Sequence, residues 1–171
     1  MSNNWLIYLA DKQVNFASSP LSGLGKIMML ELNTAPSAGK ELSEGTYNVL
    51  NPEEIKSAAS LAPFTVVPGL VSDNSVYGTW YLATETKGGQ LQPLCGAQKG
   101  TVSVKKSGQT YTIDFDVTDD DYKISVKGSY TGKPYIYDGT ANTTSVSTRT
   151  TAASGKVLNI RNSARHQTLR K

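Results

Sequence analysis

One stretch, residues 100–132, constrains the fold of this chain more than any other, because its apolar residues recur at every second position. Two tight turns, at Ser107-Gly108 and at residues 119–121, divide it into three segments. The side chains of a strand alternate between two faces, so a period of two predicts strands with one dry and one wet face. In the middle segment the dry face carries Tyr111, Ile113, Phe115 and Val117. The stretch therefore predicts a half-buried antiparallel meander.

Short apolar runs, separated by Gly, Pro, Ser and Asp, continue along the rest of the chain. Such spacing is typical of many short strands joined by turns. We expect strands in residues 5–10, 26–33, 45–50, 64–71, 76–85 and 90–95, an extended piece at 133–137, and a hairpin from 144–149 and 156–161. The sequence thus predicts an all-β fold: an antiparallel β-sandwich or flattened β-barrel of about eight to ten strands.

A single helix signal interrupts this pattern near residues 52–60. Asn51 is a preferred N-cap, Pro52 suits the first helical position, and two glutamates follow where the helix dipole favours negative charge. Apolar residues then recur at helical spacing up to Pro63. We expect one short helix that covers an edge of the β structure.

The length of 171 residues suits one domain, which we assign to residues 1–162. Residues 163–171 form a basic tail that we expect to fray. The net charge of +3 divides unevenly, because residues 139–171 hold six Lys or Arg and no acidic residue. No aromatic residues are interleaved with these charges to stack on bases, so we expect no nucleic-acid partner.

The cysteine content and the N-terminus say little about the compartment. The single cysteine, Cys95, excludes an internal disulfide and lies in an apolar run, as an inert buried thiol would. No run reaches the roughly 20 apolar residues of a membrane span, and the first residues lack the features of a signal peptide. The protein is then either cytoplasmic or a mature domain. Membrane attachment would require a lipid anchor that this chain does not carry.

No catalytic constellation stands out. His166, the only histidine, lies in the basic tail, and the residues Gly23-Leu24-Gly25-Lys26 lack the spacing of a phosphate-binding loop. We therefore expect no enzymatic activity and no cofactor. A hydrolase with paired carboxylates stays open as an alternative, because their separation in space decides that chemistry.

The acidic residues at and before the second meander turn are the one concentration of metal-ligand types. Calcium requires six or more converging oxygens, and the chain lacks the glycine and glutamate of an EF-hand loop. Asp116, Asp119 and Asp121 are the candidate calcium ligands. The alternative is an ordinary solvated turn.

Aromatic side chains are the remaining functional signal. Rings exposed on a β surface can stack on the apolar face of a sugar while polar neighbours bind its hydroxyl groups. The candidate ligand-binding residues are Trp80, Tyr135 and Tyr137. Packing in the core is the alternative for each ring.

Several short motifs occur together in the order seen in one group of proteins. They are Gly45-Thr46-Tyr47, Gly100-Thr101-Val102-Ser103-Val104, Gly108, Tyr111-Thr112-Ile113-Asp114-Phe115-Asp116, Asp119-Asp120-Asp121 and Gly128-Ser129-Tyr130-Thr131-Gly132. Over roughly residues 5–132 the chain resembles the small β domains of cell-surface and periplasmic lipoproteins of Bacteroidetes. The resemblance implies a cell-envelope protein, in the periplasm or on the outer surface, involved in glycan capture or adhesion.

Together these features predict a non-catalytic cell-envelope β domain that binds a glycan or another surface ligand, such as a surface protein. One alternative is a structural or adhesive subunit that self-associates through a strand edge. The second alternative is the hydrolase with paired carboxylates.

Overall fold

The computed structural model describes residues 2–11, 13–16, 21–36, 41–55, 57, 61–73, 75–137 and 157–162, the segments 135–137 and 157–162 by their backbone. Within these ranges the chain forms fifteen strands and the 3-10 turn η2 (Pro52–Glu54). The strands are β1 (Asn3–Ala10), β2 (Val14–Asn15), β3 (Ser22–Gly23), β4 (Gly25–Thr34), β5 (Gly45–Val49), β6 (Thr65–Val66), β7 (Leu70–Ser72), β8 (Ser75–Tyr77), β9 (Trp80–Thr84), β10 (Gln92–Gly96), β11 (Lys99–Ser107), β12 (Thr110–Asp119), β13 (Ile124–Gly132), β14 (Tyr135–Tyr137) and β15 (Val157–Asn162). The all-β prediction is confirmed.

One large curled sheet contains most of these strands, and β4 lies at its centre. Its main path runs β13-β12-β11-β5-β6-β4-β1-β15-β14. All eight residues of β1 pair with one edge of β4. The other edge pairs with β9 at residues 25–29 and with β6 at residues 32–33, so the sheet forks at this strand.

The sheet is mixed, which corrects the prediction of purely antiparallel pairing. β5 pairs with β6 in parallel, and β14 pairs with β15 in parallel. Neither pair is joined by a tight turn, because residues 50–64 separate the first two strands and residues 138–156 separate the second two. A connection of that length permits the parallel direction, whereas a two-residue hairpin does not.

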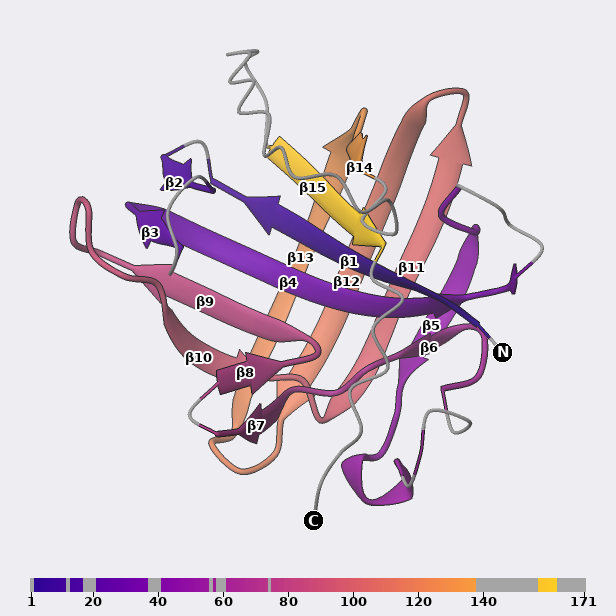
Figure 1. Cartoon of the computed structure of the whole chain (residues 1–171), viewed down its shortest axis with the longest axis horizontal. Coiled ribbons are helices and arrows are strands. Elements are labelled where there is room, and N and C mark those ends of the chain that lie inside the picture. The colour runs from indigo at the N-terminus through magenta and orange to yellow at the C-terminus, as the bar shows by residue number, and fades with distance from the viewer. Residues whose placement is uncertain are drawn as a thin grey trace.

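The curl of the sheet brings its two halves face to face. In Figure 1, β1, β4 and β9 cross in front of β11, β12 and β13. The main core fills the space between these halves, and its buried members come from both. They include Trp5, Ile7, Met28, Leu30 and Leu32 from the first half, and Val102, Val104, Tyr111, Ile113 and Val117 from the second. The alternating apolar face of the meander is therefore the wall of this core, as the sequence predicts.

A second, smaller core covers the opposite face of β1, β4 and β9. It contains Ile27, Met29 and Leu82, with Val14 and Leu91 packed over them from the connecting segments. Because both faces of β1 and β4 are covered, each of these strands contains an unbroken apolar run, residues 5–10 in β1 and residues 27–30 in β4. The central strands are thus fixed from both sides, and the meander has one free face.

The expected helix is present only as a single 3-10 turn, Pro52–Glu54. Asn51 Oδ1 accepts a hydrogen bond from Glu53 N at 3.1 Å, as the capping signal predicts. The turn ends at Ile55 and buries none of its own side chains, so no packing extends it. Residues 56 and 58–60 lie outside the described residues.

The last expected hairpin and the basic tail are only partly within the described chain. Residues 157–162 do form a strand, but β15 pairs with β1 and β14. The expected partner, residues 144–149, and the tail at residues 163–171 lie outside the described residues.

Candidate binding site on the outer face of the meander

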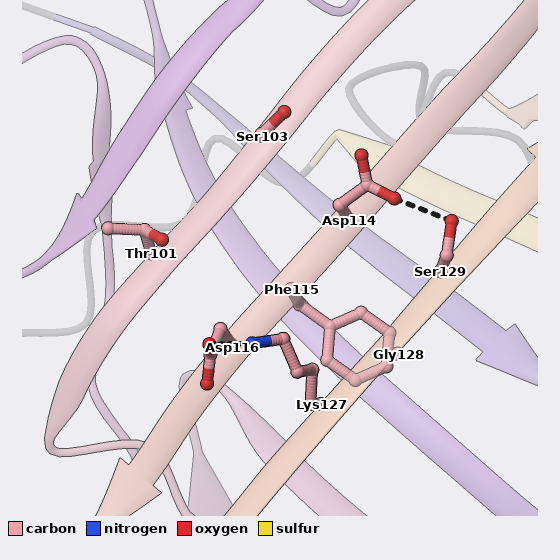
Figure 2. A pocket seen from close by; sticks show the side chains of 8 residues that line it. All are labelled: Thr101, Ser103, Asp114, Phe115, Asp116, Lys127, Gly128 and Ser129. Carbon is pink, nitrogen blue, oxygen red and sulfur yellow. Dashed lines mark hydrogen bonds and ion pairs between the residues drawn. The ribbon is translucent and has the colours of Figure 1, made fainter.

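The wet face of β11, β12 and β13 carries two rows of polar side chains that run across the strands. The antiparallel register aligns Thr101 with Asp116 and Asp116 with Lys127. The neighbouring row aligns Ser103 with Asp114 and Asp114 with Ser129. Directly opposed side chains in such ladders have Cβ atoms roughly 5 Å apart. Hydroxyl, carboxylate and ammonium groups thus alternate across a small area of sheet (Figure 2).

These rows line a shallow hollow of about 450 Å³, which we call the outer groove. Its lining residues are Thr101, Ser103, Asp114, Phe115, Asp116, Lys127, Gly128 and Ser129. A volume of this size is within the range of small-molecule sites. The groove lies on the half of the sheet whose other face is anchored in the main core, so its backbone is held in place.

The charged and hydroxyl groups of the outer groove contact one another. Lys127 Nζ donates to Asp116 Oδ2 at 2.6 Å, and Ser129 Oγ donates to Asp114 Oδ1 at 2.5 Å. The hydrogen bond to Asp116 and its negative charge raise the pKa of Lys127 above its ordinary value. Both partners of the ion pair are solvent-exposed, with 77% of the Lys127 side chain and 49% of the Asp116 side chain accessible. An exposed pair of this kind is weak and can exchange partners with a ligand.

Phe115 and Gly128 form the floor of the groove between the two polar rows, and the Phe115 side chain points to the core face of the sheet. They are register partners on β12 and β13, and the ring of Phe115 lies against the Cα of Gly128. Because glycine has no side chain, the ring fits into the space that a Cβ atom would take. Phe115 is partly exposed and packs against the main core.

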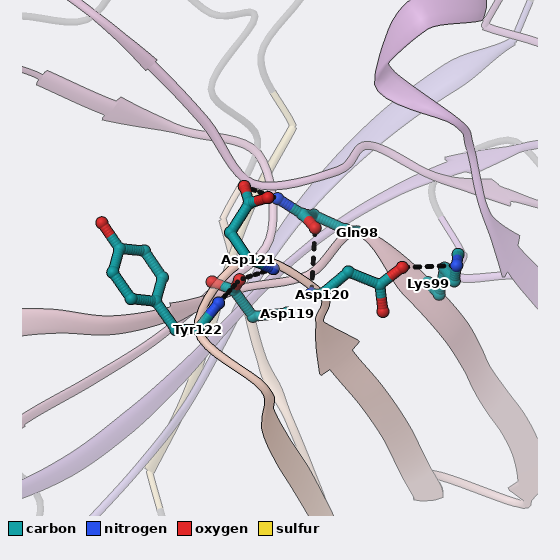
Figure 3. Close-up of polar contacts among 6 residues, drawn as sticks. All are labelled: Gln98, Lys99, Asp119, Asp120, Asp121 and Tyr122. Atoms are coloured by element: carbon teal, nitrogen blue, oxygen red, sulfur yellow. Dashed lines mark hydrogen bonds and ion pairs between the residues drawn. The ribbon is translucent and has the colours of Figure 1, made fainter.

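The acidic turn after β12 is held in place by hydrogen bonds between side chains and backbone groups (Figure 3). Asp119 is 3% exposed, and its carboxylate accepts hydrogen bonds from the backbone N–H groups of Gly96, Asp121 and Tyr122 at 3.0–3.1 Å. Gln98 Nε2 donates to Asp121 at 2.6 Å. The carboxylate of Asp119 thus ties the end of β10 to the turn.

The three calcium candidates are not brought together. Asp116 faces outward in the groove, whereas Asp119 falls on the opposite face of β12, because strand side chains alternate. Asp121 is exposed in the turn, and Asp120 pairs with Lys99. Among the described residues, no group of three or more His, Cys, Asp or Glu is placed to hold a metal ion.

Trp80 lies on a different part of the sheet from the other two aromatic candidates. Trp80 is in β9 and Tyr135 and Tyr137 are in β14, with β4, β1 and β15 between those strands. Trp80 is half-buried against the second core, its ring lies over Gly96, and its Nε1 donates to Tyr77 O at 2.7 Å. Tyr135 and Tyr137 are placed by their backbone, opposite Asn159 and Arg161 of β15. Their strand is thus not a neighbour of the strand that carries Trp80.

Sequence reasoning missed most of the outer groove. The alternation places Asp114 and Asp116 on one wet face, but it does not reveal that Ser129 and Lys127 lie opposite them. That alignment follows from the register between β12 and β13, which the lengths of the strands and their turn determine. The Asp-x-Asp spacing on a wet strand is the one signal that pointed to this face.

A half-buried glutamate was also missed. Glu31 lies on central strand β4, where its Oε1 accepts from Asn4 Nδ2 at 3.0 Å and the backbone at Gly78 donates a further hydrogen bond. Burial raises its pKa above the ordinary value, and the two hydrogen bonds oppose this shift only in part. The position lies away from the outer groove, so Glu31 affects stability more directly than binding.

Comparisons with known proteins add no functional assignment. None of the helical segments in the described ranges is long and apolar enough to cross a membrane. No protein-family model matches the chain, and no curated protein or solved structure matches it either.

Proposed function

We propose that this protein is a non-catalytic binding module and that its outer groove binds a glycan. The observation that carries the proposal is the pair of cross-strand rows, Thr101–Asp116–Lys127 and Ser103–Asp114–Ser129. Each row offers hydrogen-bond donors and acceptors in turn, at a spacing of roughly 5 Å from one side chain to the next. Neighbouring hydroxyl groups of a sugar, which both donate and accept, match such a pattern.

The floor of the groove supports the same ligand class. Gly128 lies between Lys127 and Ser129 and carries no side chain, so the C–H face of a sugar ring can lie against the backbone there, beside the polar rows. The groove carries two carboxylates and one ammonium group, so its charge does not favour a polyanion. A neutral or weakly basic glycan is the ligand class that fits best.

We further propose that the curled sheet forms a flattened barrel and that the protein works in the cell envelope, as its resemblance to envelope lipoproteins implies. Its partner there would be a glycan or a glycan-bearing surface protein. The absence of catalysis is part of this proposal, since both groove carboxylates lie on one exposed strand face and already bind Lys127 and Ser129. A hydrolase requires two carboxylates on opposite sides of the scissile bond.

The test is a glycan array probed with the whole protein, followed by calorimetry on the best ligand. Replacing Asp114 by Ala removes the centre of one row, and we expect at least a roughly tenfold loss of affinity. Thr112→Ala is the matched control, because Thr112 bonds Thr131 on the same wet face but outside the groove. An array without binding by the folded protein, or equal affinity in Asp114→Ala, contradicts the proposal. Cleavage of the bound glycan would favour the hydrolase alternative.

A second candidate function is self-association through β13. In the described part of the sheet this strand lies at the end of the main path and pairs only with β12. An uncovered strand edge can pair with a second copy. Sedimentation velocity at rising protein concentration tests it: a shift toward dimers supports self-association, and a constant monomer contradicts it.

A further inference from the structure

A second hollow lies on the inner side of the same meander strands. Leu9, Met28 and Tyr81 line it from β1, β4 and β9, and Phe115 and Tyr130 line it from β12 and β13. We call it the inner hollow. It lies between the two halves of the curled sheet, whereas the outer groove faces solvent. Phe115, Gly128 and Ser129 border both.

We propose that the inner hollow is a binding site for a ring-sized, largely apolar molecule with one polar substituent. This site lies on the opposite face of the meander from the proposed glycan groove. The two share Phe115, Gly128 and Ser129 at their border, but neither proposal depends on the other. Its volume is about 190 Å³. An apolar cavity of roughly 150 Å³ already accommodates benzene, so the inner hollow has room for one substituted ring.

The lining side chains favour an apolar occupant. Met28 and Tyr130 are each 3% exposed, whereas Tyr81 and Phe115 are partly exposed although both pack against the main core. Both line the hollow. Filling it with a ring would remove apolar area from water, which is favourable. Three aromatic side chains and a methionine also provide the edge and sulfur contacts that aromatic ligands use.

Two oppositely charged residues lie at the rim. Asp11 and Lys26 border the hollow, and Asp11 Oδ2 accepts a hydrogen bond from the backbone N–H of Lys26 at 2.9 Å. This bond fixes the carboxylate where β1 ends and β4 begins. A hydroxyl substituent on the ligand could reach the carboxylate or the exposed ammonium group while its ring stays inside. A phenol is therefore the simplest probe of the proposed class.

The experiment is an NMR titration of the whole protein with p-cresol. We expect saturable shifts of the Leu9 and Met28 methyl signals, and intermolecular NOEs from the p-cresol ring to the Met28 methyl group. The Leu42 methyl signals are the internal control, because Leu42 belongs to the same core and does not line the hollow. Absence of saturable shifts and NOEs at Met28 overturns the proposal, and so do equal shifts at Leu42.

A matched pair of variants tests the location. Tyr81→Trp adds bulk to the hollow, so p-cresol affinity should fall at least about tenfold. Tyr77→Trp makes the same change on β8, away from the hollow, and should leave the affinity unchanged. Asp114→Ala, which tests the glycan groove, should also leave p-cresol binding intact. Unchanged affinity in folded Tyr81→Trp overturns the proposal, and the NOEs locate p-cresol in the wild-type protein without any substitution.

Discussion

The ring of Phe115 lies against the backbone of Gly128, its register partner on the neighbouring strand. A Cβ atom added to Gly128 would come within 3.0 Å of Phe115 Cε1 and Cε2, which is closer than carbon atoms pack. The outer groove and the inner hollow meet at this pair. The fit between the two residues therefore shapes both proposed sites.

The first prediction concerns this fit. Gly128→Ala should lower the free energy of unfolding by about 1–3 kcal/mol, because the new methyl group forces the Phe115 ring out of its place. Gly128 is not among the residues with positive φ, so backbone strain does not contribute. Urea denaturation measures the change.

A double-mutant cycle separates this clash from any other effect of the alanine. Phe115→Leu removes the ring, so adding Gly128→Ala to that variant should cost clearly less than it does alone. Additive costs in the double variant would show that the two residues are not coupled.

The second prediction concerns the buried carboxylate of Asp119. Asp119→Ala leaves the backbone donors of Gly96, Asp121 and Tyr122 without their acceptor, and we expect a loss of about 3 kcal/mol or more. Asp121→Ala is the matched control in the same turn. Its side chain is exposed and accepts from Gln98, so the change should stay within about 0.5 kcal/mol. Similar losses of unfolding free energy in both variants would show that the hydrogen bonds of Asp119 have no special role. Thermal and urea unfolding provide the comparison.

The third prediction is a pH dependence caused by Glu31. Burial raises its pKa in the folded state above the ordinary value of 4.5, so the folded protein keeps this proton to a higher pH than the unfolded chain does. The resulting stability is fully present below the unfolded pKa and is lost as pH rises through the folded pKa.

The Glu31→Gln variant has no titratable group at this position. Its stability therefore does not fall with pH for this reason. The free energy of unfolding of the wild type, minus that of Glu31→Gln, should fall as the pH rises above the ordinary pKa of 4.5. Urea unfolding at several pH values measures it. A difference that stays flat, or that rises with pH, is incompatible with a raised pKa.

The fourth prediction concerns the thiol of Cys95. It is 1% exposed, and burial, together with the charge of Asp119, raises its pKa. Thiols react as thiolates, so the folded protein should react with a disulfide reagent at least about 100-fold more slowly than the urea-unfolded chain. Asp119→Ala should speed the reaction by loosening the turn next to it. Equal rates in folded and unfolded protein would refute this placement of Cys95.

Local patterns in the sequence predict the meander correctly, and the reason is physical. Alternation reflects burial on one face, and the odd-numbered residues Tyr111, Ile113 and Val117 are indeed buried, whereas Asp114 and Asp116 line the outer groove. Each strand there is joined to the next by a short turn, so neighbours in the sequence are neighbours in the sheet.

Pairings between distant segments leave no such pattern. Asp119 is buried because Gly96, far back in the chain, donates to it, and a local reading of the acidic turn predicts a solvated site or a metal ligand instead. The fork at β4 and the parallel pair of β5 and β6 likewise depend on long connections without periodicity. The site residues that sequence reasoning missed, Lys127 and Ser129, required the register itself.

The pairing of β1 also determines when the sheet can be completed during synthesis of the chain. One edge of β1 joins β4 soon after synthesis, but the other edge pairs Ala10 with Val157 and Trp5 with Asn162. A nascent polypeptide must therefore emerge from the ribosome at least to Asn162 before that edge is covered. Until then the unpaired edge of β1 can pair with strands of other incomplete chains. Slow translation or premature termination should therefore favour inclusion bodies.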